Sequence, residues 1–155
     1  MMNIYDVLNE LNINYEEVEH KQVFSAEESQ HIKNLIKGIG CKNLFLKDKE
    51  NKYYLCLISD EKKANLKELA KLVDKKHFTF ATEVELKNIL NLSIGSVTPL
   101  GIINDKENKV KLLIDKDLEN NKILMHSNVN TKTLSMEYKD LIKFIDYFKH
   151  KYVIF

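Results

Sequence analysis

The sequence predicts a single α/β domain with a mixed, mostly antiparallel sheet and surrounding helices. Helical and strand periodicities are interspersed without a regular β-α repeat, and polar segments between apolar runs indicate hairpins. The chain has 155 residues, 44% of them hydrophobic, which is enough for one core. No linker, repeat or low-complexity stretch divides it, so we treat residues 1–155 as one domain.

The first helices and the strand between them follow from spacing and capping. Apolar residues at helical spacing predict a helix over residues 4–11, and an extended segment over 15–18 follows. Ser25 and Glu28 have the spacing of a capping box, which predicts a second helix that reaches Ile36.

Two hairpins are predicted where polar loops separate apolar runs. The first joins residues 43–47 to 53–58, and the second joins 100–103 to 110–114. The same periodicities predict the remaining elements: helices over 65–73, 82–90 and 138–148, and strands over 78–80, 123–125 and 133–136.

Charge and composition exclude several classes of protein. The 24 basic and 23 acidic residues give a net charge of +1, which is unlike a general nucleic-acid coat protein. Every basic residue is lysine, so arginine's bidentate contacts to phosphate or guanine are absent. The start lacks a signal-peptide layout and no run of 18 apolar residues exists, so we expect a cytoplasmic protein without membrane or DNA partners.

The two cysteines, Cys41 and Cys56, indicate neither a disulfide framework nor a metal site. They are 15 residues apart, with no CxxC motif and no histidine at ligand spacing. We therefore predict reduced, buried thiols and no bound metal.

The segment over residues 95–101 is expected to have an unusual backbone conformation, because it holds two of the four glycines and the only proline. Glycine permits positive φ, while Pro99 pushes Thr98 toward an extended conformation. N–H groups presented near Gly95 and Ser96 could hold an anion or a developing oxyanion without a catalytic side chain. An ordinary tight turn is the alternative. GxSxG, HExxH, Walker and GxGxxG motifs are absent, so a hydrolase here would act mainly through backbone groups and its substrate.

Two polar features have both a functional and a structural interpretation. His126 ends a predicted strand beside a polar stretch that runs to Asn130, and is either a binding residue or a structural one. Four lysines recur every four residues, so on one continuous helix they would form a face that is either solvated or in contact with RNA: Lys63, Lys67, Lys71 and Lys75.

Several segments, in this order, carry a family resemblance: residues 20–28, 42–48, 80–83, 95–101, 104–105, and His126 with Asn130. They resemble the prolyl-tRNA editing superfamily, and within it the freestanding alanyl-tRNA(Pro) deacylases. The resemblance spans nearly the whole chain. It implies the YbaK-like aminoacyl-tRNA editing fold and hydrolysis of the ester between a wrong amino acid and tRNA(Pro), with alanine as the leading substrate. Esters of cysteine or serine, or a non-enzymatic amino-acid or aminoacyl-tRNA-binding module, remain alternatives.

The resemblance also implies roles for individual residues. Lys42 falls on the family's functional lysine, and the backbone at Gly95 and Ser96 completes the implied catalytic set. The implied substrate-binding residues are Ser25, Asn43, Val97, Thr98, Pro99, His126 and Asn130. The candidate tRNA contacts are Lys63, Lys67 and Lys71. Water assisted by the substrate's ribose hydroxyl is the implied nucleophile, so we expect no cofactor. We expect a monomer whose partners are the acceptor end of mischarged tRNA and prolyl-tRNA synthetase.

Overall fold

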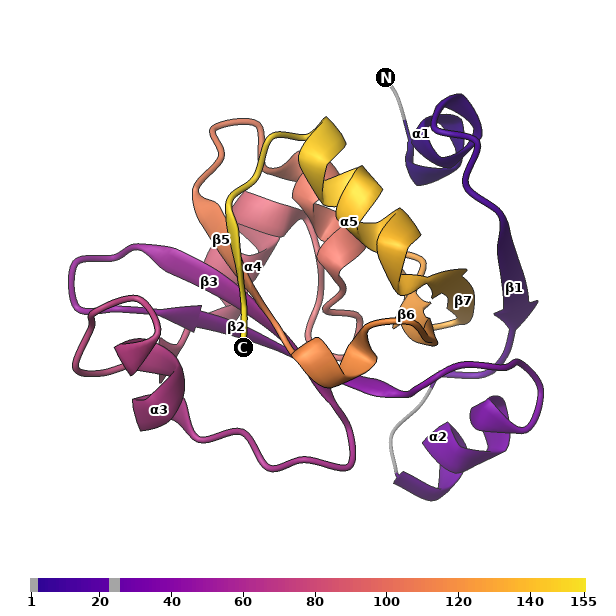
Figure 1. The fold of residues 1–155 in the computed structure, drawn as a ribbon, viewed down its shortest axis with the longest axis horizontal. Coiled ribbons are helices and arrows are strands. Elements are labelled where there is room, and N and C mark those ends of the chain that lie inside the picture. The colour runs from indigo at the N-terminus through magenta and orange to yellow at the C-terminus, as the bar shows by residue number, and fades with distance from the viewer. Residues whose placement is uncertain (1–2, 23–25) are drawn as a thin grey trace.

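Two β-sheets share one hydrophobic core in the computed structural model, which describes residues 3–22 and 26–155 (Figure 1). The helices are α1 (Ile4–Glu10), α2 (Ala26–Lys33), α3 (Leu66–Lys71), α4 (Glu83–Leu90) and α5 (Tyr138–Tyr147), with 3-10 helices η1 (Pro99–Asn104) and η2 (Lys116–Leu118). The strands are β1 (Tyr15–Glu19), β2 (Cys41–Lys47), β3 (Tyr53–Ser59), β4 (Thr79–Phe80), β5 (Val110–Ile114), β6 (Lys122–His126), β7 (Lys132–Glu137) and β8 (Tyr152–Ile154).

The smaller sheet is antiparallel, and the larger one is mixed. The smaller has the strand order β1-β7-β6, and the larger has the order β4-β2-β3-β5-β8. In the larger sheet β2 pairs antiparallel with β3 and β4, whereas β5 is parallel to both β3 and β8. The predicted mixed and mostly antiparallel α/β architecture is therefore confirmed, although the strands are divided between two sheets.

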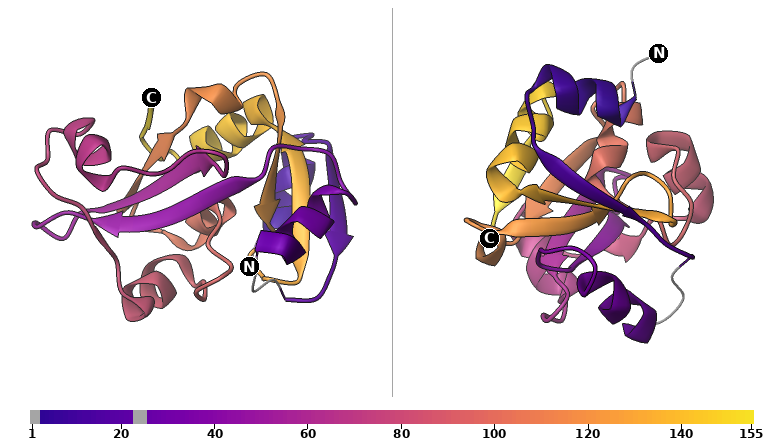
Figure 2. Two further views of the ribbon diagram at one scale, coloured as in Figure 1. Left: turned by 90° about the horizontal axis from the view of Figure 1, so that it is seen from below. Right: turned by 90° about the vertical axis from the view of Figure 1, so that its right-hand side faces the viewer.

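A short parallel bridge joins the two sheets. The N–H of Ile39 donates to the carbonyl of Lys122, and the N–H of Leu124 donates to the carbonyl of Ile39, both at 2.9 Å. Beyond this bridge β2 and β6 continue in separate sheets. Figure 1 shows the β2–β3 hairpin and α3 on the left and β1 with α2 on the right; the turned views of Figure 2 show the same division.

The core fills both faces of the larger sheet because side chains alternate along its strands. Phe45 belongs to the main cluster, with Leu141 and Phe144 of α5, whereas the next residue, Leu46, belongs to a second cluster with Leu69 of α3. This alternation assigns neighbouring residues of β2 to opposite faces.

The second predicted hairpin is wrong. Residues 99–104 form η1, because Pro99 takes the first helical position and the Thr98 hydroxyl accepts from the N–H of Leu100. The following strand, β5, pairs in parallel with β3.

Helix lengths and one edge strand also differ from the sequence prediction. The helix predicted to reach Ile36 ends at Lys33, and the helix predicted over residues 65–73 spans only Leu66–Lys71. The edge strand β8 was not predicted. The capping residue proposed for α2, Ser25, lies outside the described residues.

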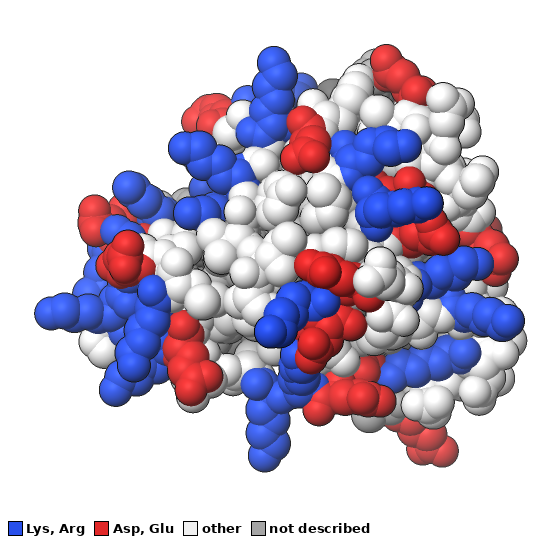
Figure 3. Space-filling model, in the orientation of Figure 1, with Lys and Arg blue, Asp and Glu red and all other residues white. Residues whose placement is uncertain are grey.

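Surface charge is mixed, as the net charge of +1 predicts. Lysine and acidic side chains are interspersed over the face shown in Figure 3. Within residues 3–22 and 26–155, no helix has the length and apolar character needed to cross a bilayer.

Candidate active site

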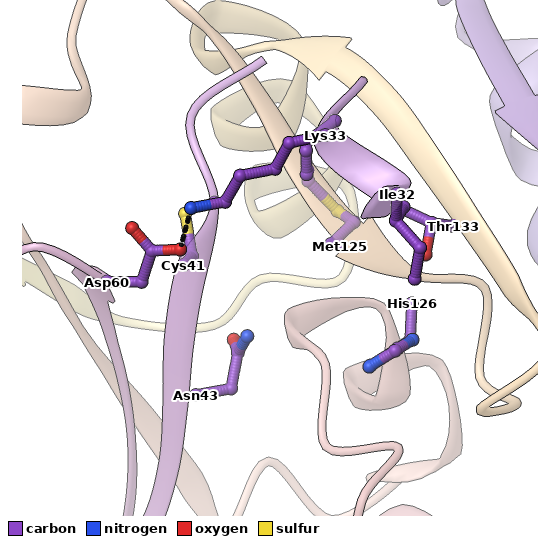
Figure 4. Close-up of a pocket in the computed structure, with 10 residues that line it drawn as sticks. Ile32, Lys33, Cys41, Asn43, Asp60, Met125, His126 and Thr133 are labelled. Carbon is purple, nitrogen blue, oxygen red and sulfur yellow. Dashed lines mark ion pairs between the residues drawn. The ribbon is translucent and has the colours of Figure 1, made fainter. Parts of the chain in front are cut away.

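A cavity of about 100 Å³ opens where β2 and β6 separate beyond the bridge (Figure 4). The larger sheet supplies Cys41 and Asn43, the smaller sheet supplies His126 and Thr133, and α2 closes one side. The complete lining is Ile32, Lys33, Gly40, Cys41, Asn43, Asp60, Leu124, Met125, His126 and Thr133. The cavity is therefore shared between the two sheets.

Asn43 and His126 each place a buried polar atom without a partner in this region. Asn43 Oδ1 and His126 Nδ1 have no hydrogen-bond partner among the described residues. Buried polar groups are nearly always hydrogen-bonded, so an unsatisfied pair lining one cavity indicates a site for a polar ligand or water. An amide oxygen accepts from an ammonium group, as an amino acid would provide.

The His126 imidazole is held in its neutral form. Burial lowers its pKa from the ordinary value of 6.5, and the nearby His20 adds to this effect, while a backbone hydrogen bond at Lys132 opposes it. The rings of His20 and His126 are 6.5 Å apart. In neutral His20, Nδ1–H donates to the Lys21 carbonyl at 2.7 Å and Nε2 accepts from the Thr133 hydroxyl at 2.8 Å. His20 is thereby fixed beside the cavity.

The outer wall of the cavity is an ion pair packed against a glycine. Lys33 Nζ lies 2.5 Å from Asp60 Oδ2 and links α2 to the end of β3 (Figure 4). A Cβ on Gly40 would overlap both Asp60 Oδ2 and Lys33 Cε. Only glycine lets the pair lie this close to the backbone.

Cys41 lines the cavity as a protonated thiol. Burial, with the charges of Asp60 and Asp115, raises the pKa of Cys41 to about 12. Cys56 is buried, Cys41 is half-buried, and both cysteines are free. The predicted burial is confirmed for Cys56 and is only partial for Cys41, and Cys41 is not an activated nucleophile at neutral pH.

Lys42 is not brought into the cavity. Its side chain leaves the face of β2 opposite to Asn43, and Nζ donates to the carbonyl of Lys62 at 2.6 Å. In this arrangement the ammonium does not face the cavity in which Asn43 and His126 meet. A direct role in stabilising charge inside the cavity, as the sequence predicts, does not match this position.

The glycine-proline loop meets the β6–β7 turn. Gly95 has φ of +94°, and a Cβ there would lie 3.4 Å from Asn130 Nδ2. The predicted need for glycine at this position is therefore confirmed. Asn130 and Gly95 are brought together beside the strand end that carries His126.

Ser96 makes hydrogen bonds within this loop. Its N–H and its hydroxyl both donate to the carbonyl of Ser93, at 3.1 Å and 3.0 Å, and Oγ accepts from the N–H of Ser93 at 3.3 Å. The predicted oxyanion contact from the Ser96 N–H is therefore wrong in this conformation.

The remaining loop residues shape the backbone and do not line the cavity. Thr98 and Pro99 are buried, and Thr98 caps η1. Val97 is half-buried against the main core. Their predicted contacts with the amino acid would have to be indirect.

The predicted lysine face is shorter than the spacing suggests. Lys67 and Lys71 lie on α3, whereas Lys63 precedes the capping residue Asn65. Lys75 follows the helix, and its Nζ lies 2.7 Å from Glu50 Oε1. Lys63, Lys67 and Lys71 are exposed, and their contact with tRNA stays a prediction.

Several cavity residues were missed by sequence reasoning because only strand pairing reveals them. Thr133 lies opposite His126 in the β6–β7 register, and Asp60 is brought to Lys33 by the turn after β3. Ile32 is the apolar contribution of α2. In the described part of the chain, no group of three or more metal-ligating side chains is placed to hold an ion.

Comparisons with known proteins identify the family of this chain. The aminoacyl-tRNA editing domain family model matches residues 20–144. The prolyl-tRNA editing protein ProX of Acetoanaerobium sticklandii is 35% identical over 140 residues, covering 89% of this chain and 85% of ProX. Prolyl-tRNA synthetase associated domain-containing protein 1 of Bos taurus is 36% identical over 151 residues, covering 93% and 87%.

Solved structures share the fold. A crystal structure of a hypothetical protein has a TM-score of 0.74 at 13% identity and covers 96% of this chain and 95% of its own. Another, assigned as a candidate trans-editing enzyme for prolyl-tRNA synthetase, has a TM-score of 0.70 at 18% identity, with coverage of 95% and 90%. The family model match and the 35% identity to ProX show that the protein belongs to the aminoacyl-tRNA editing family of deacylases.

Proposed function

We propose that this protein hydrolyses alanine from mischarged tRNA(Pro), acting in trans on the free aminoacyl-tRNA. Family membership and the similarity to a prolyl-tRNA editing protein support an activity on mischarged tRNA(Pro). The preference for alanine rests on the cavity between β2 and β6.

The observation that carries this proposal is a small cavity with an unsatisfied acceptor. At about 100 Å³ it is smaller than the roughly 150 Å³ cavity that holds a benzene molecule in another protein. Asn43 Oδ1 would accept from the amino acid's ammonium, with the small side chain among Ile32 and Met125. Each methylene that does not fit costs about 1–3 kcal/mol of selectivity, so proline would be disfavoured by size.

The chemistry assigns the attack to water. Cys41 is protonated and Ser96 is bonded within its own loop, so neither is activated as a nucleophile. An aminoacyl ester is already reactive. Holding it beside a positioned water lowers much of the remaining activation barrier for hydrolysis. Neutral His126 presents Nδ1 as an acceptor for a hydroxyl or water proton, and the N–H of Gly95 remains our candidate oxyanion donor.

Lys42 contributes from outside the cavity in this proposal. An ammonium has three donors, and only one is used by the Lys62 carbonyl. The other two could hold a phosphate of the tRNA 3′ end while the ester enters between the sheets.

One assay tests the proposed function. The purified protein is incubated with tRNA(Pro) charged with alanine, cysteine, serine or proline, and the remaining ester is measured with time. We expect alanine to be released fastest and proline to be retained. Preferential release of cysteine or serine would reassign the substrate, and tight binding without hydrolysis of any ester would indicate a binding module.

A further inference from the structure

A second, larger cavity lies at the opposite end of the five-stranded sheet. It has a volume of about 680 Å³ and is formed where β3 and β5 begin and where α5 connects to β8. Six of its ten lining residues are lysines, and none is acidic. We call this cavity the lysine groove, and its lysines are Lys52, Lys75, Lys109, Lys111, Lys149 and Lys151.

The lysine groove concentrates positive charge in a protein whose net charge is only +1. Because the whole chain has a net charge of +1, the residues outside the groove are net acidic. Lys75 pairs with Glu50 at 2.7 Å and with Asp48 at 3.7 Å, and Lys109 pairs with Glu107 at 3.4 Å. The other four lysines of the groove have no ion pair within the described residues. Figure 3 shows mainly blue side chains at the upper left, where β5 begins and α5 connects to β8 in Figure 1.

One lysine of the groove has an unusual backbone. Lys149 has φ of +58°, while every other described non-glycine residue with positive φ is asparagine or aspartate. Those two residues tolerate the left-handed region best among residues with a side chain, and glycine usually takes this position after a helix. A lysine is therefore placed here at a steric cost.

The neighbouring residue anchors this turn to the sheet. His150 is buried, and its Nδ1–H donates to the Val110 carbonyl at 2.8 Å. Lys149 and Lys151 flank this anchor and are exposed, so both ammonium groups are held beside the start of β5.

We propose that the lysine groove binds the phosphate backbone of the tRNA whose 3′ end enters the cavity between β2 and β6; this rests on the proposed function. Lysine serves as a point charge for phosphate and needs no base sequence. The seven residues of β3 separate the two ends of the sheet by roughly 20 Å, a span that one RNA can bridge. Protein interfaces are depleted in lysine, whereas six of the ten residues that line this groove are lysines.

The test removes two charges from the groove. Lys111→Gln with Lys151→Gln is compared with the wild type and with a control of equal charge change, Lys87→Gln with Lys122→Gln, whose lysines are exposed and outside the groove. Binding of uncharged tRNA(Pro) and of polyglutamate is measured between about 50 and 300 mM salt. Deacylation is measured with full-length Ala-tRNA(Pro) and with a short aminoacylated 3′ fragment.

We expect the groove variant to bind tRNA at least tenfold more weakly and to lose about 1.4–1.8 from the slope of log K against log salt, at about 0.7–0.9 per phosphate contact. Its rate on the short fragment should equal that of the wild type, and the control should behave as the wild type throughout.

An unchanged salt slope would overturn the proposal that the lysine groove binds tRNA, even if Ala-tRNA(Pro) is hydrolysed normally. If the groove variant loses binding to tRNA and to polyglutamate equally, the groove is a general anion site, and the proposal that its ligand is RNA is overturned. A wild type that hydrolyses no ester but keeps the groove-dependent salt slope would overturn the proposed function instead.

Discussion

Lys42 and Asn43 are consecutive residues of β2 whose side chains leave opposite faces of the sheet. Asn43 lines the cavity between β2 and β6, whereas Lys42 Nζ donates to the Lys62 carbonyl at 2.6 Å. Their proposed roles therefore differ: Asn43 holds the amino acid, and Lys42 holds the nucleic acid outside the cavity.

For Lys42→Ala we expect kcat/KM for Ala-tRNA(Pro) to fall by roughly 10-fold, because a hydrogen bond to a charged phosphate contributes about 1.5 kcal/mol or more. Because the ammonium lies outside the cavity, the loss should appear mainly in KM. Steady-state kinetics and single-turnover rates at saturating tRNA separate an effect on KM from an effect on kcat. A fall in kcat with KM unchanged would instead place the ammonium at the reacting ester.

For Asn43→Ala we expect a 10- to 100-fold loss in kcat/KM, because a hydrogen bond to a charged group contributes about 1.5–3 kcal/mol. Asn43→Asp, which keeps an acceptor at the same place, is the matched control and should retain more activity. The short aminoacylated fragment should reveal the same loss. If both variants hydrolyse it at the wild-type rate, the amide does not hold the ammonium.

For the glycine-proline loop we expect Gly95→Val to abolish activity, because a β-branched residue is strained at φ of +94°. Ser96→Ala should keep much of the rate while losing about 1 kcal/mol of stability for each hydrogen bond to Ser93. Rates and urea denaturation measure both effects. An acyl-enzyme trapped on Ser96 would show that this residue is the nucleophile after all.

For the cavity wall we expect Ile32→Ala to release proline from Pro-tRNA(Pro), reducing the preference for alanine by 10- to 200-fold. Ile36→Ala is the control, because Ile36 shares the same small apolar cluster but does not line the cavity. Both substitutions should destabilise the fold similarly, by about 2–5 kcal/mol. Selectivity is read from the ratio of kcat/KM values, and an equal change in both variants would exclude a specific role for Ile32.

For His126 we expect a pH dependence of stability with a definite sign. Burial depresses its pKa in the folded state, so below pH 6.5 the unfolded chain binds a proton that the folded protein resists. Stability should therefore fall as pH drops from 6.5 toward the depressed value. Urea denaturation at pH 7.5 and 5.0 should show a smaller fall for His126→Gln than for the wild type. An equal fall in both proteins would locate the titration elsewhere.

Local patterns in the sequence predict most elements correctly, because these elements depend on near neighbours. The capping box at Thr82 and Glu85 begins α4 as expected, and the polar loop at 48–52 closes the β2–β3 hairpin. The segment at 100–103 fails because its apolar residues suit a strand, while Pro99 and Thr98 favour a helical turn.

Residues of the site are harder to predict because their meeting depends on long-range pairing. The resemblance identifies Asn43 and His126, which line one cavity, but the spacing of the sequence does not reveal that Lys42 faces the opposite way. Asp60 and Lys33 are 27 residues apart in a region without a motif, and only the position of α2 against the end of β3 brings them together.

The bridge at Ile39 and Ile123 gives the site an unusual dependence on the rest of the protein. Asn43 belongs to one sheet and His126 to the other, so the width of the gap between them is set by how the two sheets pack. In the proposed function this cavity selects the amino acid by size, so we expect a small shift of its walls to change that selection. We therefore expect substitutions that touch no substrate, but shift one sheet against the other, to alter which aminoacyl esters the protein hydrolyses.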